Sequence, residues 1–79
     1  MTLDMLLPGQ SADILDIDET GDETLHRLDE LGFVPGQCLT MLQEAPLGDP
    51  LAVRILNYEL CIRKKEASLI RVRLREGDC

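Results

Sequence analysis

Aromatic side chains are almost absent from this chain, which has one Phe, one Tyr and no Trp among 79 residues. Proteins that bind single-stranded nucleic acid usually stack the bases on aromatic rings, so the sequence argues against that function. The core must be built from Leu, Ile and Val instead. A chain of this length predicts one domain over residues 1–79, with a small core and little room for an enzymatic cleft.

Basic residues are scarce in the first part of the chain. Up to Pro50, Arg27 is the only basic residue against eleven acidic ones, whereas seven basic residues accompany four acidic ones from Leu51 onward. These counts give −10 for the first part and +3 for the second. The total of −7 opposes binding to nucleic-acid phosphates or anionic lipids. The division predicts either a polarised surface for a partner of mixed charge or ordinary solvated faces.

Long apolar runs and a secretory signal peptide are also missing from the sequence. We therefore expect a cytoplasmic protein that does not insert into a membrane. The three cysteines, Cys38, Cys61 and Cys79, contain no CxxC pair, which fits a reducing compartment and gives no zinc-site signature. We expect Cys79 to be mobile and the other two thiols to be half-buried.

The stretch from Leu25 to Gly36 predicts a short helix that turns at once into a strand. Leucines recur at helical spacing, and Gly32 supplies the left-handed residue that ends a helix. Pro35 then prevents further helix and Gly36 allows a turn. The pattern predicts a helix over 23–31 and a strand over 37–43.

Alternating apolar and polar residues predict four further strands, over 11–18, 51–56, 59–64 and 69–75. In the last of these, Ile70, Val72 and Leu74 are expected on the core face. A short helical turn is expected over 65–68, where the alternation lapses.

Two local features indicate how these strands bend and connect. The apolar parity changes near Ile14 and Leu15, which indicates a bulge or sharp bend. Asn57 is suited to a tight reversal, since Asn tolerates the left-handed conformation. Five short strands, one small helix and no long crossover predict a mainly β fold, a small antiparallel SH3-like barrel with one short α-helix.

The acidic run from Asp16 to Glu23 can be interpreted in two ways. It partly matches the calcium-binding loop template, but Arg27 occupies the position of the bidentate Glu and Thr20 stands where Asp or Asn is usual. The alternative is a polar loop in which Thr20 caps the helix and Glu23 completes a capping box.

His26 is the only histidine of the chain. A metal site built from His26, Cys38 or Cys61 would need the fold to bring distant residues together, so we expect no metal-ligating residues. The sequence also contains no phosphate-binding loop and no paired nucleophile and base. We therefore expect no enzyme, no catalytic residue and no bound cofactor.

Two motifs, RLDELGFVPG at 27–36 and APLGDP at 45–50, occur in an order that resembles the FeoA-type family. Its members are small cytosolic accessory proteins of bacterial ferrous iron uptake. The resemblance covers nearly the whole chain and includes Pro8-Gly9-Gln10 and LCIRKKEASLIRV at 60–72. It implies an SH3-like fold and, as partner, a FeoB-type membrane transporter with a cytosolic G domain.

The resemblance implies a non-enzymatic module that binds and modulates this transporter from the cytosolic side. We expect the contact on the 45–50 loop and the nearby helix, through Leu47, Asp49, Arg27 and His26. Leu47 could instead fold back as a lid over the barrel. Two other functions stay open: a metal-responsive SH3-like domain that binds a transition metal or regulates a metal-dependent protein, and a structural subunit that self-associates weakly.

Overall fold

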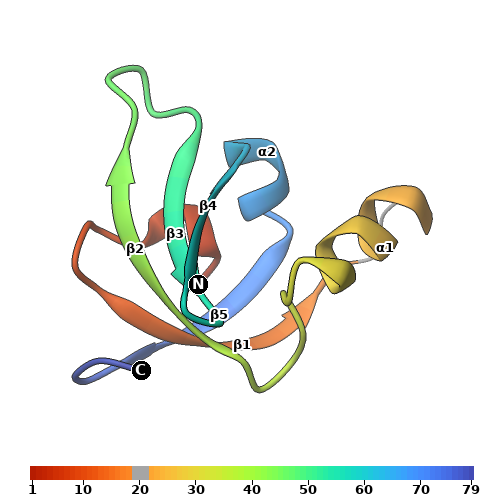
Figure 1. Cartoon of the computed structure of the whole chain (residues 1–79), viewed down its shortest axis with the longest axis horizontal. Coiled ribbons are helices and arrows are strands. Elements are labelled where there is room, and N and C mark those ends of the chain that lie inside the picture. The colour runs from red at the N-terminus through yellow and green to blue at the C-terminus, as the bar shows by residue number, and fades with distance from the viewer. Residues whose placement is uncertain (19–21) are drawn as a thin grey trace.

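The computed structural model describes residues 1–18 and 22–79 (Figure 1). Five antiparallel strands form one sheet in the order β4-β3-β2-β1-β5. The elements are η1 (Leu3–Met5), β1 (Ser11–Ile17), α1 (Asp22–Glu30), β2 (Cys38–Glu44), β3 (Leu51–Ile55), β4 (Tyr58–Ile62), α2 (Lys64–Ala67) and β5 (Ile70–Arg75). Within the described ranges, no helix is long and apolar enough to cross a bilayer.

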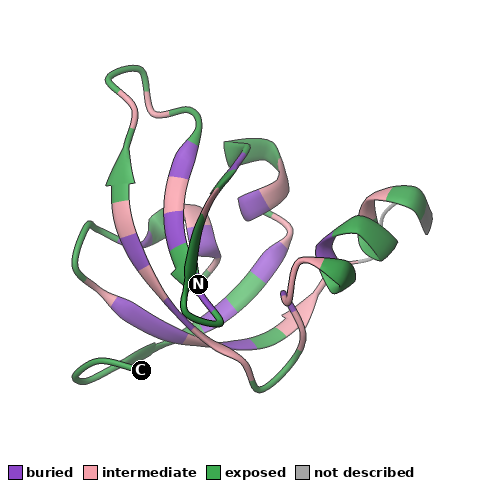
Figure 2. Cartoon of the chain, viewed as in Figure 1, coloured by how far each residue is buried: buried purple, intermediate pink, exposed green. Residues whose placement is uncertain are grey.

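The core lies inside the curved sheet and is aliphatic apart from Phe33 (Figure 2). Every strand contributes to it, together with Leu3 and Leu6 from the start of the chain and Leu28 from α1. This arrangement confirms the prediction of a mainly β, antiparallel fold with one small helix before the second strand. The predicted bounds are correct to within one or two residues.

The end of β5 departs from the prediction. Ile70 and Val72 are buried, but Leu74 is 50% exposed, so its assignment to the core was wrong. A bridge between Thr2 and Arg71 places the start of the chain along the first half of β5, and Leu74 lies beyond it. The alternation of side chains continues to Leu74, but β5 extends beyond the N-terminal segment that covers its first half.

The predicted bulge in β1 is confirmed. The register between β1 and β5 shifts between Ile14 and Asp16, which makes Leu15 the extra residue. The tight reversal after β3 is also confirmed, because Leu56 and Asn57 have φ angles of 52° and 68°. Two consecutive positive φ angles are typical of the turn that suits the twist of a two-residue hairpin.

The helix-to-strand junction follows the glycine and proline pattern of the sequence. Gly32 and Gly36 have φ angles of 101° and 90°, so both lie in the region that favours glycine. The cap predicted at Thr20 and the turn of the calcium template at Gly21 lie outside the described residues.

Candidate functional site

The loop between β2 and β3 is closed by its own backbone. The Ala45 amide donates to the Pro50 carbonyl at 3.1 Å, and the Gly48 amide donates to the Ala45 carbonyl at 2.7 Å. Leu47, at the tip, is 96% exposed. The alternative in which this leucine folds back over the barrel is therefore wrong, and its side chain stays available for contact.

Asp49 anchors this loop to α2. One carboxylate oxygen accepts a hydrogen bond from the Lys64 backbone amide at 2.9 Å, and the other lies 3.8 Å from the Arg63 guanidinium. The Lys64 amide is at the first turn of α2, where backbone donors lack partners within the helix and the dipole favours a negative charge. Asp49 thus caps α2 from another part of the chain.

Arg27, on α1, reaches the same small helix from the other side. Its guanidinium pairs with the Glu66 carboxylate, whose side chain is only 14% exposed. Glu66 also accepts a long hydrogen bond of 3.4 Å from the Arg63 backbone amide. Because α2 links Arg27 to Asp49, two residues that lie far apart in the sequence belong to one continuous surface.

We call this region the loop–α2 surface and define it by Arg27, Leu47, Gly48, Asp49, Arg63, Lys64, Lys65 and Glu66. It contains a hollow of about 340 Å³. The hollow is lined by Arg27, Pro50, Cys61, Ile62, Arg63 and Glu66. The loop and α2 are both seen in the upper part of the view in Figure 1.

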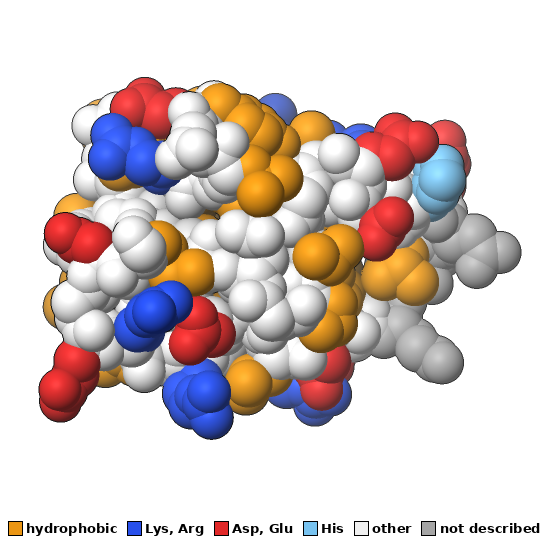
Figure 3. Space-filling model, turned by 60° about the horizontal axis from the view of Figure 1, so that its bottom comes forward, with side chains coloured by type: hydrophobic (Ala, Val, Ile, Leu, Met, Phe, Trp, Pro, Cys, Tyr) orange, Lys and Arg blue, Asp and Glu red, His pale blue; other side chains and the backbone are white. Residues whose placement is uncertain are grey.

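His26 does not share this surface. Its imidazole Nε2 lies 2.8 Å from the Glu30 carboxylate on the same helix. It lines a separate groove of about 680 Å³ whose apolar walls include Ile17, Leu25 and Phe33. Figure 3 shows this face, with the single histidine beside acidic side chains and close to apolar ones. The structure therefore brings together Leu47, Asp49 and Arg27 and leaves His26 apart.

The edge of the same groove carries a charge pair between strands. Arg71 donates a hydrogen bond to the Asp16 carboxylate at 2.5 Å and also approaches Asp18 at 3.5 Å. The hydrogen bond is the main reason that the pKa of Asp16 lies below its ordinary range, and the positive charge of Arg71 acts in the same direction. Desolvation opposes both effects and is second in size to the hydrogen bond.

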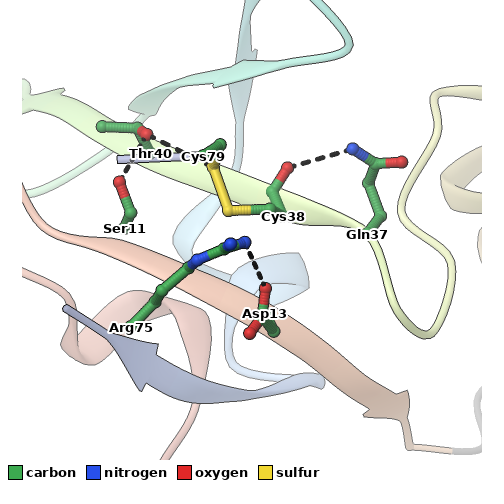
Figure 4. Close-up of a disulfide and its surroundings, with 7 residues drawn as sticks. All are labelled: Ser11, Asp13, Gln37, Cys38, Thr40, Arg75 and Cys79. Carbon is green, nitrogen blue, oxygen red and sulfur yellow. Dashed lines mark hydrogen bonds and ion pairs between the residues drawn. A yellow bond between two sulfur atoms is a disulfide. The ribbon is translucent and has the colours of Figure 1, made fainter. Parts of the chain in front are cut away.

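Two cysteines depart from the sequence-based expectation. Cys38 and Cys79 form a disulfide, so the expectation of a mobile Cys79 was wrong (Figure 4). Strand β1 lies between β2 and β5, with Ser11 paired to Thr40 on one side and to Arg75 on the other. Cys79 follows β5 and Cys38 begins β2, so only β1 lies between the strands that the disulfide connects.

Cys61 is a free thiol and is exposed rather than half-buried. Its position in β4 puts its side chain opposite the face that carries Leu60 and Ile62, as the alternation predicts. In the part of the chain that the structure describes, no three His, Cys, Asp or Glu side chains gather in a way that could hold a metal ion.

The family model described as the FeoA domain matches residues 1–74. The chain belongs to the FeoA family. The resemblance recognised in the sequence motifs is thus confirmed, and the family connects the chain with ferrous iron transport.

Among curated relatives, the chain is 38% identical over 74 residues to an Fe(2+) transport protein A/Fe(2+) transporter FeoB fusion protein of Porphyromonas gingivalis. The match covers 94% of this chain but only 9% of that protein, so this FeoA-family chain corresponds to a small part of its relative.

Solved structures of the family share the fold. Iron(II) transport protein A of Clostridium thermocellum is 43% identical, with a TM-score of 0.85, over 94% of this chain and 45% of that one. A Stenotrophomonas maltophilia FeoA, solved in complex with zinc and described as a procaryotic SH3 domain protein, is 33% identical, with a TM-score of 0.80. That match covers 92% of this chain and 89% of the other, and it confirms the SH3-like fold.

Sequence reasoning did not place α2 at the candidate site. The basic run Arg63-Lys64-Lys65 and the lapse in alternation were both visible in the sequence. However, only the fold reveals that Lys64 and Glu66 receive contacts from the 45–50 loop and from α1.

Proposed function

We propose that this FeoA-family protein is a non-enzymatic accessory module that binds a FeoB-type membrane transporter from its cytosolic side. Binding there would bias the conformations or the nucleotide cycle of the transporter, because a ligand shifts an equilibrium through its different affinities for the two states. The Porphyromonas gingivalis relative supports this association, since its name places FeoA and FeoB parts in one polypeptide.

The observation that carries the proposal is the exposure of Leu47 on a loop that is already held in shape. The loop is closed by two backbone hydrogen bonds and tied to α2 through Asp49. A preorganised loop loses little conformational entropy when it docks, so more of its contact energy is available as affinity. An exposed leucine side chain on such a loop is better suited to contact with another protein than to catalysis, because it carries no polar or ionisable group.

The described side chains also favour a binding module over an enzyme. The single histidine is paired with Glu30 on the surface of α1, and the Ser11 hydroxyl shares a hydrogen bond of 2.7 Å with the Thr40 hydroxyl. Neither arrangement pairs a nucleophile with a general base. Any GTP hydrolysis would then belong to the partner's G domain.

Co-purification from detergent-solubilised membranes tests the association itself. A tagged FeoB-type transporter from the same organism should retain this protein, and the same transporter without its G domain should not. Equal retention by both forms would place the contact outside the G domain. Absence of retention by the full transporter would contradict the proposal.

A metal-responsive role is the second candidate, and the zinc complex of the Stenotrophomonas maltophilia relative favours it. In this chain the candidate ligands are dispersed, because His26 and Cys61 border different hollows and Cys38 is joined to Cys79. Metal titration of the isolated protein distinguishes the two functions.

A further inference from the structure

The loop–α2 surface carries the opposite charge from the rest of the molecule. It contains four cationic side chains, Arg27, Arg63, Lys64 and Lys65, and two carboxylates, Asp49 and Glu66. The surface therefore has a net charge of +2, and the remainder of the chain has −9, given the total of −7.

The two carboxylates of this surface are already engaged within the protein. Asp49 accepts from the Lys64 amide and faces Arg63, while Glu66 pairs with Arg27. Their charges are thus compensated where they stand, and neither needs a partner from outside.

The two lysines differ in this respect. Both are exposed, and among the described residues no carboxylate oxygen lies within 4.0 Å of either ammonium group. The Lys64 ammonium lies beside the loop tip, 3.8 Å from where a Cβ on Gly48 would be. A cation with no carboxylate partner among the described residues therefore lies next to the glycine that follows Leu47.

We infer that the loop–α2 surface binds an acidic segment of the partner that also carries an apolar side chain. The apolar side chain contacts Leu47, and carboxylates of the segment pair with Lys64 and Lys65. The charge of −9 elsewhere repels such a segment, which directs its approach to this surface. The inference rests on the proposed function, because it specifies the chemistry of the partner at the same surface.

Charge reversal tests the inference against a matched control. The double variant Lys64→Glu/Lys65→Glu replaces the two lysines of α2, and Arg54→Glu/Arg73→Glu makes the same change in net charge on strands β3 and β5. Binding to the labelled G domain of the FeoB-type transporter is followed by fluorescence anisotropy. We expect a Kd increase of roughly tenfold for the lysine variant at low ionic strength and a much smaller one for the control. At roughly 0.5 M salt the difference should largely disappear, because exposed charges are screened.

A second probe separates failure of the inference from failure of the proposed function. It is a synthetic peptide of alternating Glu and Leu, compared with a peptide of alternating Lys and Leu. If the G domain binds the wild-type protein and both double variants equally, the inference is wrong and the proposed function stands.

If neither the G domain nor the full transporter binds, but the Glu peptide binds the wild-type protein and loses affinity only with the lysine variant, the inference stands and the proposed partner is wrong. Equal binding of the Glu and Lys peptides to the wild-type protein would overturn the inference. Failure of both the G domain and the Glu peptide to bind would also overturn it.

Discussion

Gly32 lies against Leu56, so that a Cβ on Gly32 would be 2.6 Å from the Leu56 Cδ1 atom. The end of α1 thus packs directly on the turn between β3 and β4, and the Tyr58 hydroxyl donates to the Leu31 carbonyl at the same junction. Gly32 therefore has a positive φ, and a Cβ at this position would displace the end of the exposed Leu56 side chain.

Replacement of this glycine should be costly. We expect Gly32→Val to lower the free energy of unfolding by more than about 1 kcal/mol, because β-branched residues tolerate a positive φ poorly. Gly36→Val is the matched control, since Gly36 also has a positive φ but has no atom within 4 Å of its Cβ position. Thermal unfolding of both variants should show the larger loss for Gly32→Val, and an unchanged melting temperature of this variant would contradict the assignment of Gly32 to this junction.

The disulfide should contribute to stability through the unfolded state. It closes a loop across a sequence separation of 41, so the unfolded chain loses conformational freedom when the bond is present. We expect Cys38→Ser/Cys79→Ser to lower the free energy of unfolding by roughly 2 to 4 kcal/mol.

Treatment of the wild-type protein with a dithiol reductant should give the same melting temperature as this double variant. Cys61→Ser should leave the melting temperature unchanged, since that thiol is free and exposed. A wild-type protein whose stability does not respond to the reductant would show that the bond does not support the fold.

Arg71 should control the titration of Asp16. Its hydrogen bond lowers the pKa of this carboxyl, so the pair stabilises the fold above the carboxyl's unfolded pKa. That contribution is lost as the pH falls through the lower, folded pKa. In Arg71→Gln, NMR titration should show the pKa of Asp16 rising toward its ordinary value, with a small effect on stability because the pair is exposed. An unchanged titration midpoint for Asp16 would mean that Arg71 does not determine the pKa of this carboxyl.

Metal titration should distinguish an interaction module from a metal-responsive domain. Calorimetry of the isolated protein with Fe(II) or Zn(II), under anaerobic conditions, should show no stoichiometric binding in the low micromolar range. Submicromolar affinity that disappears in His26→Ala or Cys61→Ser would favour the metal-responsive role instead.

Much of the fold could be predicted because its signals are local. The positive φ angles at Gly32 and Asn57 follow from which residues tolerate that conformation, and the bulge at Leu15 follows from a change in apolar parity. The exposure of Leu74 could not be predicted in this way. Alternation assigns a side chain to a face of the sheet but does not show how far the covering layer extends.

The candidate site was harder to predict than the fold, because it depends on contacts between residues that are far apart in the sequence. The sequence indicated the 45–50 loop and Arg27 as contacts, but not that α2 connects them. The Arg27–Glu66 and Asp49–Lys64 contacts, and the Cys38–Cys79 bond, arise only when the strands are paired in their spatial order.

Binding of Leu47→Asp to the G domain of a FeoB-type transporter tests the central claim most directly. Leu15→Asp is the control, because Leu15 is also exposed but lies at the bulge in β1. We expect Leu47→Asp to weaken binding by at least about tenfold, on the scale of a central interface residue, with an unchanged melting temperature. The control should bind as the wild-type protein does. Full binding by a well-folded Leu47→Asp variant would contradict the assignment of the loop–α2 surface as the site that contacts the transporter.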